Sequence, residues 1–130
     1  MASIFTKIIQ GEIPCYKVGE DESHFAFLDI NPNSIGHTLV VPKKEVDRIW
    51  DLSEEEYIEL MRFSRKVATA IELEISCDRV GMSVIGLEVP HCHVHLIPLN
   101  DMGDASFKNS LKLHPEEFQK IADKIRKRLG

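Results

Sequence analysis

Three of the six histidines in this 130-residue chain lie at alternate positions, His91, His93 and His95, separated by Cys92 and Val94. Alternate side chains of a strand share one face, so this spacing predicts a row of imidazoles about 6.5–7 Å apart. The two apolar residues between them would then face the core. Imidazole changes its charge near neutral pH and serves as a nucleophile, a proton carrier or a metal ligand.

Three interpretations of the histidines compete. They could be surface residues on a half-exposed sheet. However, three histidines on one face of one strand, bracketed by Pro90 and Pro98, rarely arise by chance. They could form a three-histidine metal site, but one straight strand does not easily close three ligands on one ion, and no further ligand lies on that face. They could carry nucleophilic catalysis at phosphorus, in which one imidazole attacks while its neighbours orient it or bind oxyanions. We favour the third.

The histidines must be positioned by the surrounding elements, which follow from apolar periodicity, caps and turn residues. The order is a short helix capped by Ser3, three strands, a long helix behind a Ser53–Glu56 capping box, two strands and a last helix. The expected ranges are 3–10, 16–18, 24–30, 37–41, 54–74, 79–85, 93–97 and 115–129.

Tight turns join the first three expected strands, which predicts antiparallel pairing. The resulting fold class is α+β, a single domain over residues 1–130 with its helices covering one face of a mainly antiparallel sheet. A doubly wound parallel sheet would need regular alternation of strands and helices, which the element order lacks.

The composition is that of an ordinary globular domain, with 43% hydrophobic and 28% charged residues. A net charge of −5 disfavours general nucleic-acid binding, which depends on phosphate neutralisation. Cys15, Cys77 and Cys92 show no C-x-x-C spacing, so we expect reduced thiols. No secretory signal or membrane-length apolar run is visible, so we expect a cytoplasmic protein with no membrane partner.

The alternation of histidine with apolar residues over His91–Ile97 resembles the H-φ-H-φ-H-φ-φ signature of the histidine triad (HIT) superfamily, where φ is apolar. Residues 4–14, 27–32 and 36–43 are similar to blocks of its nucleotide-binding, Hint-like branch. The resemblance covers roughly residues 3–100. It implies the HIT fold, a five-stranded sheet with one long and two shorter helices, and a homodimer whose two sheets join.

The resemblance also implies roles for individual residues. His93 would be the nucleophile that takes the nucleotidyl group from the α-phosphate, and His95 would hydrogen-bond the phosphate or the leaving group. His91 would support the nucleophile through its backbone carbonyl, which fixes the His93 tautomer. His37 would orient the triad from beside it. Asp29 would accept the ribose hydroxyls.

Six apolar positions match those that wall the base pocket in this family: Ile4, Phe5, Ile8, Phe27, Ile30 and Leu39. Taken without the resemblance, several of these residues have simpler explanations. The helical spacing of the first three also describes a plain core face. Asp29, which accepts the ribose hydroxyls in the resemblance, also precedes Asn31-Pro32 and could be a turn former.

The chain departs from the family pattern in two places. The loop before the triad is short, without Asn or Gln, and Glu88 stands about where a Ser or Thr touches the phosphate in relatives; Gly86 could still give a backbone N–H. Some bacterial relatives bind a structural zinc through two N-terminal cysteines, and these positions are Ser3 and Thr6 here. We therefore expect no metal and no other cofactor.

The expected function is a hydrolase of nucleoside 5′-monophosphate derivatives, phosphoramidates or nucleotidyl anhydrides, acting through a nucleotidyl-His93 intermediate. The expected substrate is a purine nucleotide or nucleoside phosphoramidate. Three alternatives stay open. They are a nucleotide-binding or interaction module with residual catalysis, a dinucleoside polyphosphate hydrolase or nucleotidyltransferase of the same superfamily, and a metalloenzyme.

Overall fold

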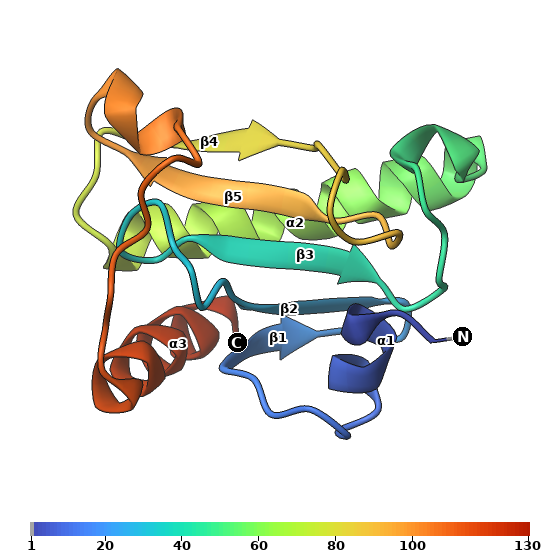
Figure 1. Ribbon diagram of the computed structural model, residues 1–130, viewed down its shortest axis with the longest axis horizontal. Helices are drawn as coiled ribbons and strands as arrows, with labels where there is room; N and C mark the ends of the chain where they lie inside the picture. Colours follow the sequence, from blue (N-terminus) through green and yellow to red (C-terminus); the bar gives the residue numbers. More distant parts are fainter. Residues whose placement is uncertain (1) are drawn as a thin grey trace.

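The computed structural model describes residues 2–130. Its helices and strands are α1 (Ile4–Ile9), β1 (Lys17–Glu20), β2 (His24–Leu28), β3 (Thr38–Pro42), α2 (Glu54–Glu74), β4 (Arg79–Ser83), β5 (Val94–Leu99) and α3 (Pro115–Leu129), with short 3-10 turns η1 (Ile49–Asp51) and η2 (Met102–Ala105). The strands form one sheet in the order β1-β2-β3-β5-β4, and every neighbouring pair is antiparallel (Figure 1). The expected α+β class, with five strands, one long helix and two shorter ones, is confirmed.

The two longer helices begin and end where the sequence predicts. At the start of α2 the Ser53 hydroxyl accepts a hydrogen bond from the Glu56 backbone N–H at 3.1 Å, and the Glu56 carboxylate accepts one from the Ser53 N–H at 2.9 Å. At the start of α3, His114 is the N-cap residue and Pro115 occupies the first turn, where its missing N–H costs nothing. Phe118 of α3 is buried against the main core.

Helices cover both faces of the sheet, which corrects the expectation of a single covered face. On β2, Ala26 and Leu28 face the core formed with α2 and α3, whereas Phe25 and Phe27 pack with Phe5 of α1 on the opposite face. The sheet lies between the long helix behind it and α1 in front of it (Figure 1). Because β2 is apolar on both sides, each face must be covered, and the sequence pattern alone does not say by which helix.

Most expected strand ends are wrong by one or two residues. The clearest cause is seen after β2, which ends at Leu28 rather than residue 30. The Asp29 carboxylate accepts a hydrogen bond from the Asn31 backbone N–H at 2.8 Å and turns the chain there. β3 also continues through Pro42, whose position opposite His24 leaves its missing N–H without consequence for the ladder.

The expected row of three histidines on one strand is wrong, because the first two precede β5. The His91 backbone N–H bonds the Val89 carbonyl at 2.8 Å in a tight turn, and the Cys92 N–H bonds the Val46 carbonyl at 2.6 Å. These bonds hold the chain out of the β3–β5 ladder until after His93. The predicted alternation is nevertheless found, since Cys92 is buried in the main core, on the side of the sheet opposite the histidines.

Within residues 2–130, no helix has the length and apolar character needed to cross a lipid bilayer.

All three cysteines are free thiols. Cys92 is the buried one, and burial raises the pKa of its thiol to about 11. A thiol held in this protonated state is a packing residue rather than a nucleophile.

Candidate active site

Four histidines gather on the sheet face that α1 covers. His95 lies in β5 opposite Leu39 of β3, His37 immediately precedes β3, and His91 and His93 lie on the approach to β5. All four are buried, His91 completely. The ring centroids of His93 and His95 are 5.0 Å apart, closer than a regular strand would place them. Burial of this kind excludes the interpretation as surface residues.

The tautomer of His93 is fixed by the backbone. Its Nδ1 lies 2.8 Å from the His91 carbonyl oxygen, which can only accept, so Nδ1 carries the proton. The Nε2 of a neutral His93 therefore presents a free lone pair. The Phe5 ring meets His93 edge to face with centroids 4.9 Å apart, which restrains the imidazole from the α1 side. The structure places the His91 carbonyl where the resemblance puts it.

A second hydrogen-bonded chain ends at His95. The Asn33 backbone N–H donates to His37 Nδ1 at 2.9 Å, so a neutral His37 carries its proton on Nε2. This Nε2 lies 3.0 Å from His95 Nδ1 and donates to it, which leaves the His95 proton on Nε2. Burial, reinforced by the neighbouring imidazole, lowers the pKa of His37 to about 3 and that of His95 to about 4. His95 is thus a neutral donor at physiological pH.

His91 is held at both ring nitrogens. Its Nε2 donates to the Pro42 carbonyl at 2.8 Å, and its Nδ1 accepts from the Ser3 hydroxyl at 2.6 Å. Burial lowers the pKa of His91 and keeps the ring neutral. Glu45 completes the network, because its Oε1 accepts from the Ser3 backbone N–H at 2.6 Å and from the Thr6 hydroxyl at 2.7 Å. Both bonds lower the pKa of Glu45.

The N-terminal cluster does not suit a zinc ion. Zinc in structural sites takes thiolates and imidazoles. Ser3 and Thr6 offer neutral hydroxyls instead, and their protons are already directed to His91 and Glu45. The cluster is a closed hydrogen-bond network that fastens the start of α1 to the triad.

Asp29, His37 and His95 are the one group among residues 2–130 whose ligand atoms lie close enough to share a metal, within 4.8 Å. The tautomers oppose this use, because His37 would have to give up the Nε2 proton that it donates to His95. His91 is equally unsuited, since both of its ring nitrogens are occupied by protein groups. The donor set therefore does not fit the metal interpretation.

The expected base-pocket residues fall into two sets. Phe5, Ile8, Phe27 and Leu39 are buried together in the apolar cluster between α1 and the sheet. Ile4 and Ile30 are instead exposed. The structure thus brings four of the six expected base-pocket residues together and leaves these two outside the buried cluster.

Asp29 lies between this apolar cluster and the histidines. Burial raises the pKa of its carboxyl above the ordinary value, although the Asn31 N–H bond opposes the shift. Its Oδ2 is 3.6 Å from His37 Nε2, outside good hydrogen-bond range. The carboxylate is therefore both a turn former and a partly uncommitted acceptor.

Gly86 lines the same cavity as His93. It has a positive φ of 72° and lines a cavity of about 200 Å³ with His93, Arg48 and Trp50. Glu88, two residues further on, is exposed, and its charge contributes to the raised pKa of Asp29. The short loop thus brings a glycine backbone and a carboxylate to the same end of the site.

Sequence reasoning missed three residues of this site: Glu45, Asn33 and Phe107. The Phe107 ring meets His95 at 4.9 Å and His37 at 6.1 Å between centroids, both edge to face. No local signal marks any of the three, because each acts on a partner distant in sequence or through its backbone.

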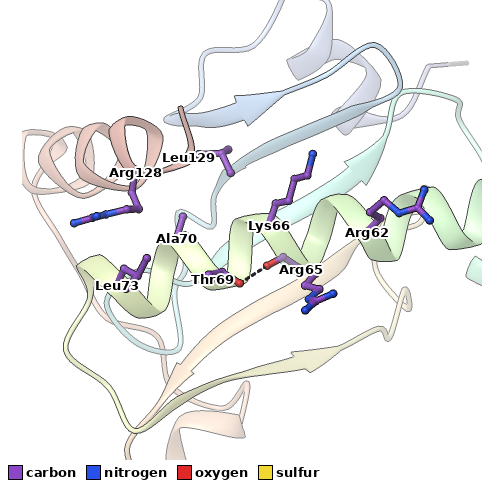
Figure 2. Close-up of a pocket in the computed structure, with 8 residues that line it drawn as sticks. All are labelled: Arg62, Arg65, Lys66, Thr69, Ala70, Leu73, Arg128 and Leu129. Carbon is purple, nitrogen blue, oxygen red and sulfur yellow. Dashed lines mark hydrogen bonds between the residues drawn. The ribbon is translucent and has the colours of Figure 1, made fainter.

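A separate cavity of about 380 Å³ lies between α2 and α3, on the face of the sheet opposite the histidines. Figure 2 shows the eight side chains that line it, four of them basic: Arg62, Arg65, Lys66 and Arg128. Arg128 is bonded to Glu74 at 2.7 Å and ties the two helices together. The lining of this cavity includes no imidazole, thiol or carboxylate.

Comparison with known proteins agrees with the geometry. Residues 10–102 match the HIT domain family. An adenosine 5′-monophosphoramidase of Schizosaccharomyces pombe is 34% identical over 128 residues, covering 96% of each chain. The crystal structure of a HIT-like protein from Bartonella henselae superposes with a TM-score of 0.84 at 31% identity, covering 97% of this chain and 95% of that one. A zinc-bound histidine triad protein from Mycobacterium smegmatis gives 0.81 at 27% identity, covering 99% and 94%. The chain belongs to the histidine triad family.

Proposed function

We propose that this protein hydrolyses nucleoside 5′-monophosphate derivatives, phosphoramidates first among them, through a nucleotidyl-His93 intermediate. The observation that carries the proposal is the pair of fixed tautomers. The His93 proton is held on Nδ1 by a carbonyl, which leaves Nε2 free to attack. The neighbouring His95 is held with its proton on Nε2, free to donate.

In the first step, His93 Nε2 attacks the α-phosphorus and forms a P–N bond. The bond from phosphorus to the leaving nitrogen breaks, and its electron pair goes to the departing amine, which takes a proton from solvent. The His93 ring becomes cationic and keeps its Nδ1–H on the His91 carbonyl. A hydrogen bond to a charged group contributes roughly 1.5–3 kcal/mol, so this contact stabilises the intermediate.

In the second step, water attacks the same phosphorus and gives up one proton to solvent. The P–N bond to His93 breaks, and the electron pair returns to Nε2. His95 donates its Nε2–H to a phosphoryl oxygen or to the leaving atom in both steps. Such a donor, fixed before the reaction, strengthens as negative charge develops on the phosphate.

The substrate class follows from the surroundings of His93. The apolar cluster of Phe5, Ile8, Phe27 and Leu39, with the exposed Ile4 and Ile30, would hold a purine base. The Asp29 carboxylate would accept the ribose hydroxyls, and the Gly86 N–H would bind a phosphate oxygen. The name of the Schizosaccharomyces relative, an adenosine 5′-monophosphoramidase, supports a phosphoramidate as the first substrate to test.

The test is intact-protein mass spectrometry after rapid mixing with adenosine 5′-phosphoramidate, quenched without acid. The parent and a His114→Ala control, which loses an exposed histidine remote from the triad, should both show a transient adduct of one nucleoside monophosphate. His93→Ala should show neither the adduct nor turnover. Equal turnover by His93→Ala and the parent would overturn the mechanism.

Glu88 favours one alternative, a nucleotide-binding module with residual catalysis. A carboxylate at the phosphate end of the site repels the substrate's negative charge. This alternative predicts nucleotide binding that survives His93→Ala and turnover near background in the parent. Dinucleoside polyphosphate cleavage and nucleotidyl transfer would use the same intermediate and differ only in the leaving group or the acceptor.

We also propose a homodimer formed along β4, which is an edge strand of the sheet. Its outer side and the following residues expose Met82, Val84 and Ile85, and Ile58 of α2 is exposed as well. Exposed apolar edge strands are ready to pair with a second chain. Light scattering should give a dimer for the parent and a monomer for Met82→Glu.

A further inference from the structure

The connection between β5 and α3 brings an aromatic ring onto the catalytic histidines. Phe107 meets His95 and His37 edge to face, at centroid distances of 4.9 and 6.1 Å. Phe107 is 47% exposed, whereas His95 is 8% and His37 1% exposed. The ring therefore lies between the hydrogen-bonded histidine pair and solvent.

This connection is fastened to the loop that sets the tautomer of His37. The Asn33 side-chain amide donates to the Asp104 carbonyl at 3.1 Å, and the Leu111 backbone N–H donates to the Pro32 carbonyl at 2.8 Å. The backbone N–H of the same Asn33 donates to His37. In Figure 1 the orange connection runs past the loop before β3 on its way to α3. Phe107 lies beyond the match to the HIT domain, which ends at residue 102.

We propose that Phe107 is a positioning residue, which closes the solvent side of the His37–His95 pair and thereby holds His95 as a neutral imidazole that donates from Nε2. The proposal rests on the proposed function, in which His95 donates to the phosphate or the leaving atom. It assigns an effect on His95 to one residue of the connection between β5 and α3, Phe107.

The groups around the pair act in opposite directions on its charge. The ionisable groups that face it are His93, on the approach to β5, and Asp29 after β2, whose Oδ2 is 3.6 Å from His37 Nε2. A carboxylate this close to His37 favours the charged ring. Burial favours the neutral ring and, together with the neighbouring His95, lowers the pKa of His37 to about 3. Removing the aromatic cover admits water and weakens the burial that keeps the pair neutral.

Protonation of the pair would disrupt the site. With a proton on both nitrogens of His95, its Nδ1–H would face the Nε2–H of His37 across the present 3.0 Å contact. Two N–H groups that point at each other across this contact repel, so one of the two rings would turn away. His95 would lose the orientation that directs its other nitrogen toward the phosphate.

The experiment measures the protonation of His95 directly, by ¹⁵N imidazole NMR over an acid titration of the full-length chain. Phe107→Ala should raise the pKa of His95 by about one unit or more. The acid limb of the kcat–pH profile with adenosine 5′-phosphoramidate should move to higher pH in the same variant. Phe107→Leu, which keeps an apolar cover, should recover most of both shifts.

Met102→Ala is the matched control, because it removes an exposed apolar side chain from the same connection. It should leave the pKa of His95 and the pH profile as in the parent. An unchanged His95 pKa in Phe107→Ala, or an equal rise in Met102→Ala, would overturn the proposal. The NMR measurement does not depend on turnover, so a parent without phosphoramidase activity would contradict the proposed function and leave the positioning of His95 to be decided by the titration.

Discussion

Acidification from pH 7 to pH 5 should destabilise this fold through His37. The folded-state pKa of His37 is about 3, because the ring is buried, against an ordinary value of 6.5. A group whose pKa is depressed on folding stabilises the folded state fully above its unfolded pKa and loses that contribution as the pH falls toward its folded pKa. The window for His37 is therefore pH 6.5 down to about 3.

The loss in the free energy of unfolding follows from how far the pH lies below the unfolded-state pKa. Each pH unit below 6.5 costs about 1.4 kcal/mol for one histidine that is protonated only when unfolded. At about pH 5 the loss from His37 is thus about 2 kcal/mol. His95, with a folded pKa of about 4, acts in the same direction. The raised pKa of Asp29 acts in the opposite direction, because its folded form takes up a proton more readily in acid.

Urea unfolding at the two pH values measures the effect, with the parent compared to His37→Asn. The variant is less stable at pH 7, but its further loss on acidification should be smaller than the parent's by about 2 kcal/mol. His114→Ala should lose as much stability between pH 7 and pH 5 as the parent does. If His37→Asn and the parent lost equal stability between pH 7 and pH 5, His37 would not be held neutral by burial, and the assigned donor chain to His95 would fail with it.

Four further substitutions probe three separate parts of the site. Ser3→Ala leaves the buried His91 Nδ1 without its donor and should lower the free energy of unfolding by about 1–3 kcal/mol, measured by urea titration, with a smaller loss for Glu45→Gln, which keeps an acceptor. Asp29→Asn should raise KM for a ribonucleoside phosphoramidate about tenfold and leave that of a dideoxy analogue unchanged, since only the hydroxyls need the carboxylate. Glu88→Ser should raise kcat/KM up to about fivefold at low salt and less at high salt, because the repulsion is screened.

Local signals predicted the elements whose causes are local. The Ser53–Glu56 capping box and the apolar spacing after it define α2 within the sequence itself, and Pro115 marks the start of α3 in the same way. Alternation between His91 and His95 correctly assigned which residues face the core. The start of β5 could not be found this way, because it is set by a bond from Cys92 to Val46, far along the chain.

The site was predicted only in part, because some of its contacts join residues distant in sequence. The family resemblance supplied the histidines, Asp29 and the His91 carbonyl that bonds His93, but not the partners that fix the protons of His37 and His91. Glu45 reaches Ser3 across 42 residues, and Phe107 reaches His37 from beyond the matched domain. Such contacts depend on which helix or loop covers which face, and periodicity identifies a face without identifying its cover.

The choice of a carbonyl as the partner of His93 has a chemical consequence. A carboxylate at the place of the His91 carbonyl would also fix the proton on Nδ1, but it would favour the charged ring. A ring charged in this way has no lone pair on Nε2 and cannot attack. A carbonyl fixes the same tautomer without a full charge, and it still stabilises the cation that forms when Nε2 bonds to phosphorus. In the proposed mechanism, the neutral network through Ser3 and Pro42, which holds His91, would leave Nε2 of His93 free before the reaction and support its charge only once the P–N bond has formed.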